Sequence, residues 1–208
     1  MTSYPLDVLV ARAAALADVG PRRVLGIVGA PGAGKSTLAA RIVEGVGPTA
    51  ALVPMDGYHL AEAELHRLGR HERKGAIDTF DASGYVSMLG RLAAGGPETV
   101  YAPAFHREIE EPIAGSIAVP EEVRLVVTEG NYLLVPDEPW SGVRLLLDEV
   151  WYLDLDEEER LRRLVDRHMA YGRTRAEAKA RSYGSDQVNA ELIATTRSRA
   201  DLVVRLSD

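Results

Sequence analysis

The segment from Gly29 to Ser36 has the residue types and spacing of a phosphate-binding loop. It fits G-x-x-x-x-G-K-[ST], in which glycines let successive backbone N–H groups point inward and the next helix adds partial positive charge. Lys35 is expected to reach the β and γ phosphates of ATP, and Ser36 to bind Mg²⁺. The predicted nucleotide contacts in this loop are Gly29, Ala30, Pro31, Gly32, Ala33, Gly34, Lys35, Ser36 and Thr37.

An ordinary glycine-rich turn between a strand and a helix is the alternative interpretation of this segment. The context disfavours it, because the motif stands between an apolar strand pattern at 24–28 and a helix pattern at 36–46, as the mechanism requires. A dinucleotide-binding G-x-G-x-x-G motif fits poorly, since no third glycine follows Gly32 and Gly34 at that spacing. We therefore expect ATP with Mg²⁺ rather than NAD.

Two carboxylates, Asp56 and Glu129, come directly after predicted buried strands at 51–55 and 124–128. Open α/β sheets bind their ligands at the carboxyl ends of such strands. Asp56 is the predicted general base that accepts a hydroxyl proton, and Glu129 is predicted to hold Mg²⁺ through water or to contact the acceptor. The two roles could be exchanged, and helix capping or turn formation is the alternative for Asp56.

A helix predicted over 157–171 carries Arg160, Arg163 and Arg167 at three- and four-residue spacing. They are expected on a flank that points away from the core. Arg163 and Arg167 are candidates to close over the nucleotide and neutralise charge during phosphoryl transfer, with surface ion pairs to nearby glutamates as the alternative. Asn189 is a candidate contact for the nucleotide base, although an exposed helix face explains it equally well.

These residues need a scaffold of alternating strands and helices. Further strand patterns lie at 150–155 and 202–206, with helix patterns at 83–93 and 187–199. The alternation predicts an α/β fold with a central, mostly parallel sheet flanked by helices. The chain of 208 residues suits one domain, with an acceptor-specificity segment at about 57–122 and a small lid at 163–186.

Composition excludes several function classes. The net charge of −7 gives no broad basic surface for nucleic acid or anionic membranes, and the absence of cysteine removes disulfides and thiolate metal sites. No stretch approaches the roughly 20 apolar residues that a membrane span requires. A cytoplasmic location fits these features, and homodimer formation stays open.

The chain resembles the superfamily of uridine kinase, phosphoribulokinase and pantothenate kinase. It is most similar to bacterial nucleoside or nucleotide kinase-like proteins, some of them labelled fructose transport system kinases. The segments that carry the resemblance are GAPGAGKST at 29–37, MDGYHL at 55–60, RKGAIDTFD at 73–81, PAFHRE at 103–108, TEGNYLL at 128–134 and RLVDRHMAYG at 163–172.

The resemblance implies a P-loop kinase fold, ATP and Mg²⁺, with Asp56 as base, Glu129 in the acceptor site and lid arginines at 163 and 167. It also implies acceptor contacts in the irregular segment, namely Tyr58, His59, Lys74, Phe80 and Arg107. Uridine kinases carry Tyr-Asp-Phe ahead of a His and an Arg, whereas this chain has Ala-Pro-Ala-Phe between Tyr101 and His106. The acceptor's identity therefore stays open.

Two functions follow from these residues. The first is an ATP-dependent kinase that phosphorylates a hydroxyl of a small metabolite such as a nucleoside, a sugar, a pantothenate-like compound or a sugar phosphate. The second is a nucleotide-dependent switch or stand-alone NTPase that acts through a protein partner, although no base-reading Asn-Lys-x-Asp of a GTPase occurs. A binding module without activity is disfavoured, because Lys35, Ser36, Asp56 and Glu129 are present together.

Overall fold

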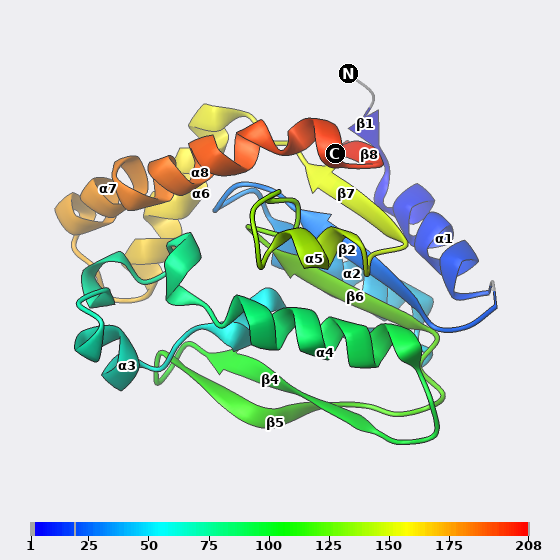
Figure 1. The fold of residues 1–208 in the computed structure, drawn as a ribbon. Coiled ribbons are helices and arrows are strands. Elements are labelled where there is room, and N and C mark those ends of the chain that lie inside the picture. Colours follow the sequence, from blue (N-terminus) through cyan, green and yellow to red (C-terminus); the bar gives the residue numbers. More distant parts are fainter. Residues whose placement is uncertain (1–2, 19, 208) are drawn as a thin grey trace.

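The computed structural model describes residues 3–18 and 20–207 (Figure 1). The strands are β1 (Ser3–Tyr4), β2 (Arg23–Val28), β3 (Ala50–Leu52), β4 (Val100–His106), β5 (Glu111–Val119), β6 (Leu125–Gly130), β7 (Glu149–Leu153) and β8 (Leu202–Leu206). The α-helices are α1 (Leu6–Ala17), α2 (Lys35–Val46), α3 (Glu62–Arg67), α4 (Ala82–Ala94), α5 (Ser141–Arg144), α6 (Glu157–Ala170), α7 (Arg175–Tyr183) and α8 (Ser185–Thr195). Short 3₁₀ helices are η1 (Met55–Tyr58), η2 (His71–Arg73), η3 (Ile77–Thr79) and η4 (Arg197–Arg199).

The central sheet has six parallel strands in the order β1-β8-β7-β2-β6-β3. The strand β2 pairs with β6 from Arg23↔Leu125 to Val28↔Gly130, and β3 pairs with the other side of β6. The carboxyl ends of β2, β6 and β3 therefore lie next to one another at one edge of the sheet. The predicted α/β fold with a parallel sheet is confirmed.

Both faces of this sheet are buried, which explains why its strands are apolar without alternation. Leu25 and Ile27 of β2 belong to a core shared with α1 and α2. Val24 and Val28, the intervening side chains, belong to a second core with α4, α5, α8 and the β4–β5 ribbon. Figure 1 shows α4 and α5 in front of the sheet and α2 behind it.

Most strand and helix predictions are confirmed with small shifts at their ends, but the strand expected at 51–55 ends at Leu52 and the helix expected at 187–199 ends at Thr195. The segment 57–122 is more regular than the sequence indicated. It contains α4, which contributes Tyr85 and Leu89 to the core, and the antiparallel ribbon of β4 and β5. The pairing of this ribbon shifts register between Ala102 and Ala104, next to Pro103. This break obscures the strand pattern in the sequence.

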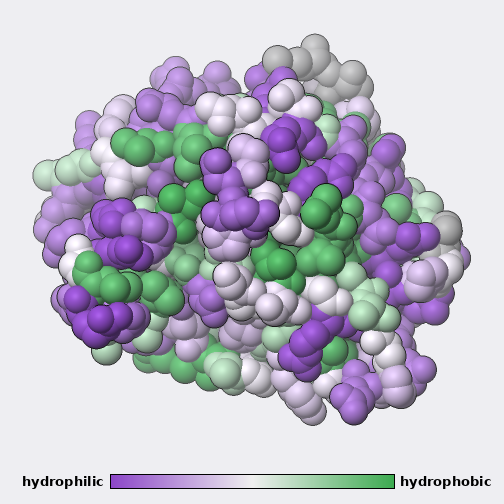
Figure 2. All heavy atoms as spheres, viewed as in Figure 1, coloured by the Kyte–Doolittle hydropathy of each residue, from purple (hydrophilic) through white to green (hydrophobic). Residues whose placement is uncertain are grey.

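Figure 2 shows hydrophilic residues over much of one face and apolar residues gathered near its middle, over α5. Leu145, directly after α5, is 86% exposed. Within residues 3–18 and 20–207, no helix has the length and apolar character needed to cross a membrane. Homodimer formation stays a prediction.

Gly57 fixes how closely η1 approaches the ribbon. A Cβ atom at Gly57 would lie 2.4 Å from the carbonyl oxygen of Pro103, whereas a Cβ atom at Gly90 in α4 would meet nothing within 4 Å. We expect Gly57→Ala to lower the free energy of unfolding by about 1–3 kcal/mol because the backbone must shift. Gly90→Ala should raise it by about 0.5–1 kcal/mol, since alanine favours a helix interior.

Urea titration of both variants measures this difference. Equal stability of the two variants would contradict the close packing of η1 on β4.

Candidate active site

The loop between β2 and α2 is shaped by glycines and covered by α6. Gly32 and Gly34 have φ angles of +83° and +96°, a region that favours glycine. A Cβ atom at Gly32 would lie 2.7 Å from Cγ of Leu164 and 2.9 Å from the carbonyl oxygen of Arg160. The loop therefore packs directly against α6, and its backbone leaves no room for a side chain at this point.

Lys35, the first residue of α2, is buried with 8% exposure. Its Nζ donates a hydrogen bond to the carbonyl oxygen of Ala30 at 3.2 Å. Burial lowers the pKa of Lys35, and the opposite charge of Glu129 partly offsets this effect. An ammonium group has three donors, so Lys35 retains donors that suit the oxygens of a bound phosphate.

Glu129 lies near the end of β6 and is only 5% exposed. Ser36 Oγ donates a hydrogen bond to its Oε1 at 2.8 Å. Burial, and then the charge of Asp56, raise the pKa of Glu129, while Lys35 counteracts them. The hydroxyl and the carboxylate form an oxygen donor pair beside Lys35, which is the donor type that Mg²⁺ prefers. The residues present therefore fit a magnesium ion.

Asp56 follows β3 in η1, and its side chain is 32% exposed, so it is more accessible than Glu129. Its Oδ2 lies 3.5 Å from Nη2 of Arg107, which follows β4. Nδ1 of His59 donates a hydrogen bond to the Asp56 carbonyl oxygen at 2.8 Å. The accessible carboxylate of Asp56 thus lies near the buried Lys35 and Glu129. This agrees with the prediction that all three lie at the same edge of the sheet.

The three arginines of α6 have different surroundings. Arg160 was expected on the outward flank, and this is wrong: it is 4% exposed and donates to the carbonyl oxygen of Pro31 at 3.3 Å. Arg163 pairs with Glu159 at 2.7 Å, and its Nη1 is 3.7 Å from a Cβ position on Gly34. It therefore lies beside the phosphate-binding loop.

Arg167 lies on the Asp56 side of the site. Surrounding protein, and then the nearby charge of Arg107, lower the pKa of the Arg167 guanidinium, while Asp186 and Asp56 raise it. Two positive charges that lie near each other, such as those of Arg107 and Arg167, destabilise each other when no anion is bound. The arrangement is typical of a binding site for a negatively charged group.

The predicted acceptor contacts separate into two sets. His59 and Lys74 both lie near Phe105, with ring centroids of His59 and Phe105 4.8 Å apart and Lys74 Nζ 5.2 Å from the Phe105 centroid. Tyr58 and Phe80 are each 8% exposed and belong to the core that includes α4. Their rings therefore serve packing, and their predicted contact with the acceptor stays a prediction.

Asn189 lies in α8 and is 8% exposed. Its Nδ2 donates a hydrogen bond to the carbonyl oxygen of Gly75 at 3.2 Å. The structure gives this side chain a partner in the acceptor segment, and it is not on an exposed face. A contact with the nucleotide base stays a prediction.

Sequence reasoning missed three residues of the site. Arg160 supports the phosphate-binding loop, and Tyr171 and Phe105 lie 5.8 Å and 5.9 Å from the guanidinium carbon of Arg107. Arg160 could have been found from its four-residue repeat with Leu164, which faces the loop. Phe105 is two residues from Arg107, but no local signal indicates Tyr171, which lies 64 residues further along the chain.

A phosphate-binding loop between the first long strand and its helix, with carboxylates at the ends of adjacent parallel strands, defines the P-loop class of α/β proteins. No protein-family model matches the chain. A Schizosaccharomyces pombe protein named "Putative uridine kinase C227.14" is 32% identical over 216 residues, covering 99% of this chain and 91% of that protein. An Aspergillus versicolor protein named "ATP-dependent kinase-like protein notR'" is 37% identical over 153 residues, covering 69% of this chain and 88% of that protein.

A solved structure agrees with these relatives. The crystal structure of a "putative fructose transport system kinase" from Silicibacter sp. TM1040 has a TM-score of 0.87 and 33% identity, and covers 98% of this chain and 100% of that chain. The chain belongs to the uridine kinase-like family of P-loop kinases. The suspected superfamily is confirmed.

Lys35 and Glu129 form a buried pair of opposite charges whose effects on stability should be coupled. Lys35→Met alone leaves the buried Glu129 without its compensating cation, and Glu129→Gln alone leaves the buried Lys35 without its anion. The double variant removes both charges. We expect it to be more stable than the sum of the single effects by about 0.5–3 kcal/mol.

Chemical denaturation of the four proteins without nucleotide measures this coupling. Strict additivity would show that the two charges do not interact across the site.

Proposed function

We propose that this protein transfers the γ-phosphoryl group of ATP to a hydroxyl group of a small molecule. The observation that carries the proposal is one sheet edge that combines a buried lysine, a buried Ser36–Glu129 oxygen pair and the accessible carboxylate of Asp56. A triphosphate on the loop would occupy the lysine side. The open carboxylate leaves room for a hydroxyl on the other side.

Each residue has a role in this reaction. Lys35 and the N–H groups of the loop bind the β and γ phosphates. Asp56 accepts the proton of the acceptor hydroxyl while the oxygen of that hydroxyl forms a bond to the γ phosphorus. The bond from that phosphorus to the β–γ bridging oxygen breaks, ADP leaves, and the proton later passes from Asp56 to solvent.

Ser36 and Glu129 are the residues that would hold Mg²⁺. When bound, this ion neutralises charge on the phosphate oxygens. Glu129 is less suited to act as the base, because it is buried and already accepts the hydrogen bond of Ser36. We therefore assign the base to Asp56 and the metal contact to Glu129.

Residues 163–186 are proposed to act as a lid. Arg163 lies beside Gly34 and Arg167 lies near Asp56, so both guanidinium groups border the place where charge develops during transfer. A glycine with a φ angle of +89°, Gly172, separates α6 from α7 and permits a change of direction there.

The test of this function is ADP formation with and without hydroxyl compounds. A kinase produces ADP that depends on the acceptor, together with a phosphorylated product that mass spectrometry detects. A nucleotide-dependent switch or NTPase produces ADP with water alone and responds to a protein partner. Hydrolysis that no hydroxyl compound stimulates would favour this second function.

Asp56→Asn should reduce acceptor-dependent turnover about a hundredfold to ten-thousandfold, because the amide cannot accept the hydroxyl proton. The Kd for Mg-ATP should change little, since the phosphates are bound by the loop. Asp166→Asn is the matched control, because Asp166 is an exposed acid on α6 that pairs with Arg162. Unchanged turnover in the Asp56 variant would remove this residue from the role of base.

A further inference from the structure

Arg107 stands on the acceptor side of Asp56 and uses little of its hydrogen-bonding capacity. Its one hydrogen bond to described residues is the 3.5 Å contact with Asp56, although a guanidinium has five N–H donors. The side chain is 39% exposed. Its guanidinium carbon lies 5.9 Å from the centroid of the Phe105 ring and 5.8 Å from that of the Tyr171 ring.

The positive charges of the site fall into two groups. Lys35 and Arg163 lie at the phosphate-binding loop, whereas Arg107 and Arg167 lie near Asp56, and the charge of Arg107 lowers the pKa of Arg167. Arg107 is held there by β4 and the aromatic rings rather than by a strong ion pair. A second negatively charged group, next to the reacting hydroxyl, would relieve this repulsion.

We propose that Arg107 binds a carboxylate or phosphate group of the acceptor, so that the substrate is a hydroxylated anion. This proposal rests on the phosphoryl transfer proposed above. The guanidinium fork matches either group with two parallel hydrogen bonds, and the acceptor hydroxyl then faces Asp56. Neutral nucleosides and sugars lack such a group and are poor substrates.

The test compares anionic acceptors with neutral ones. Hydroxy carboxylates and sugar phosphates form two arms, and their neutral amides and sugars, with uridine, form the third. We expect ADP formation to be stimulated in one or both anionic arms and not in the neutral arm. The arm that responds identifies whether the group is a carboxylate or a phosphate.

Arg107→Gln should raise the KM of the anionic acceptor about a hundredfold, because the charged group of the acceptor loses its guanidinium partner. The KM of ATP should stay the same, and Arg107→Lys should recover part of the loss. Arg41→Gln is the matched control, since Arg41 is 62% exposed on α2.

Three outcomes overturn the proposal. Turnover that is fastest with a neutral acceptor and insensitive to Arg107→Gln rejects the anionic substrate and leaves the kinase function intact. A rise in the KM of ATP instead of the acceptor places Arg107 on the nucleotide. No acceptor-stimulated turnover in any arm rejects the phosphoryl transfer itself.

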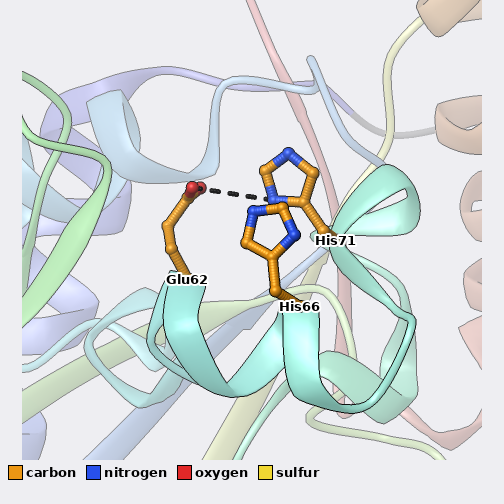
Figure 3. A group of neighbouring side chains, drawn as sticks. All are labelled: Glu62, His66 and His71. Carbon is orange, nitrogen blue, oxygen red and sulfur yellow. Dashed lines mark ion pairs between the residues drawn. The ribbon is translucent and has the colours of Figure 1, made fainter.

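A second inference comes from three side chains of the acceptor segment (Figure 3). Glu62 and His66 lie four residues apart on α3, and therefore on one helix face, and His71 approaches from η2. One ligand atom of each lies within 4.8 Å of the others. The rings of His66 and His71 stack with centroids 4.0 Å apart, and His71 Nδ1 is 3.6 Å from Glu62 Oε2.

The chemistry of this cluster suits a transition-metal ion. Nδ1 of His71 is shielded from water and has no hydrogen-bond partner among the described residues. Lys74 Nζ donates a hydrogen bond to Oε1 of Glu62 at 2.9 Å, and Oε2 of the same carboxyl group lies on the side of His71. Imidazole nitrogens with one carboxylate are ligands of Zn²⁺ and its neighbours, with water as the fourth.

We infer that Glu62, His66 and His71 bind Zn²⁺ or a similar divalent ion at a site distinct from the magnesium site. Tetrahedral ligands lie about 3.4 Å apart at ordinary Zn–N distances, so the exposed His66 must move by roughly an ångström. The ion would join α3 to η2. Arg181 of α7 donates hydrogen bonds to the carbonyl oxygens of Glu72 in η2 and of Lys74 directly after it. The ion would therefore lie next to the segment that α7 contacts.

Calorimetric titration of ZnCl₂ into the chelator-treated full chain, without nucleotide, tests this site. We expect one saturable ion per chain and a Tm that rises with Zn²⁺. His66→Gln and His71→Gln should each weaken binding tenfold or more, whereas His106→Gln, outside the cluster, should not. Equal affinity in the His71 variant, or displacement of Zn²⁺ by equimolar Mg²⁺, would overturn the inference.

Discussion

The burial of Lys35 and Glu129 at the carboxyl edge of the sheet is the constraint on which the site depends. Each charge is removed from water, so the pKa of Lys35 falls and that of Glu129 rises, and each offsets part of the other's cost. The edge tolerates them because β2 and β6 are adjacent and parallel.

In the proposed kinase reaction, Asp56 lies between the nucleotide side and the acceptor side of the site. On the first side, α6 presses on the phosphate-binding loop through Leu164 and Arg160. On the second, the β4–β5 ribbon supplies Arg107, whose guanidinium lies near Tyr171 at the end of α6. The same helix therefore lies against both the phosphate-binding loop and Arg107, so a movement of α6 would change both contacts.

The helices after α6 are attached to the segment at 72–75 by hydrogen bonds from side chains to backbone carbonyl oxygens. Arg181 donates to the carbonyl oxygens of Glu72 and Lys74, and Asn189 and Tyr132 both donate to that of Gly75. Carbonyl oxygens of one short loop thus collect donors from α7, α8 and the segment after β6. These hydrogen bonds hold α7 and α8 against the loop at 72–75 without passing through the sheet.

Much of this protein follows from local sequence. The loop from Gly29 to Ser36, the strands of the sheet and the carboxylates Asp56 and Glu129 were predicted, because motif chemistry and hydrophobic patterns act over a few residues. The structure alone decided that Arg160 is buried, that Pro103 interrupts a paired ribbon, and that Arg107 meets Asp56 across 51 residues of chain. These features depend on contacts between segments that are distant in the chain. Such contacts cannot be predicted from the residue pattern of either segment by itself.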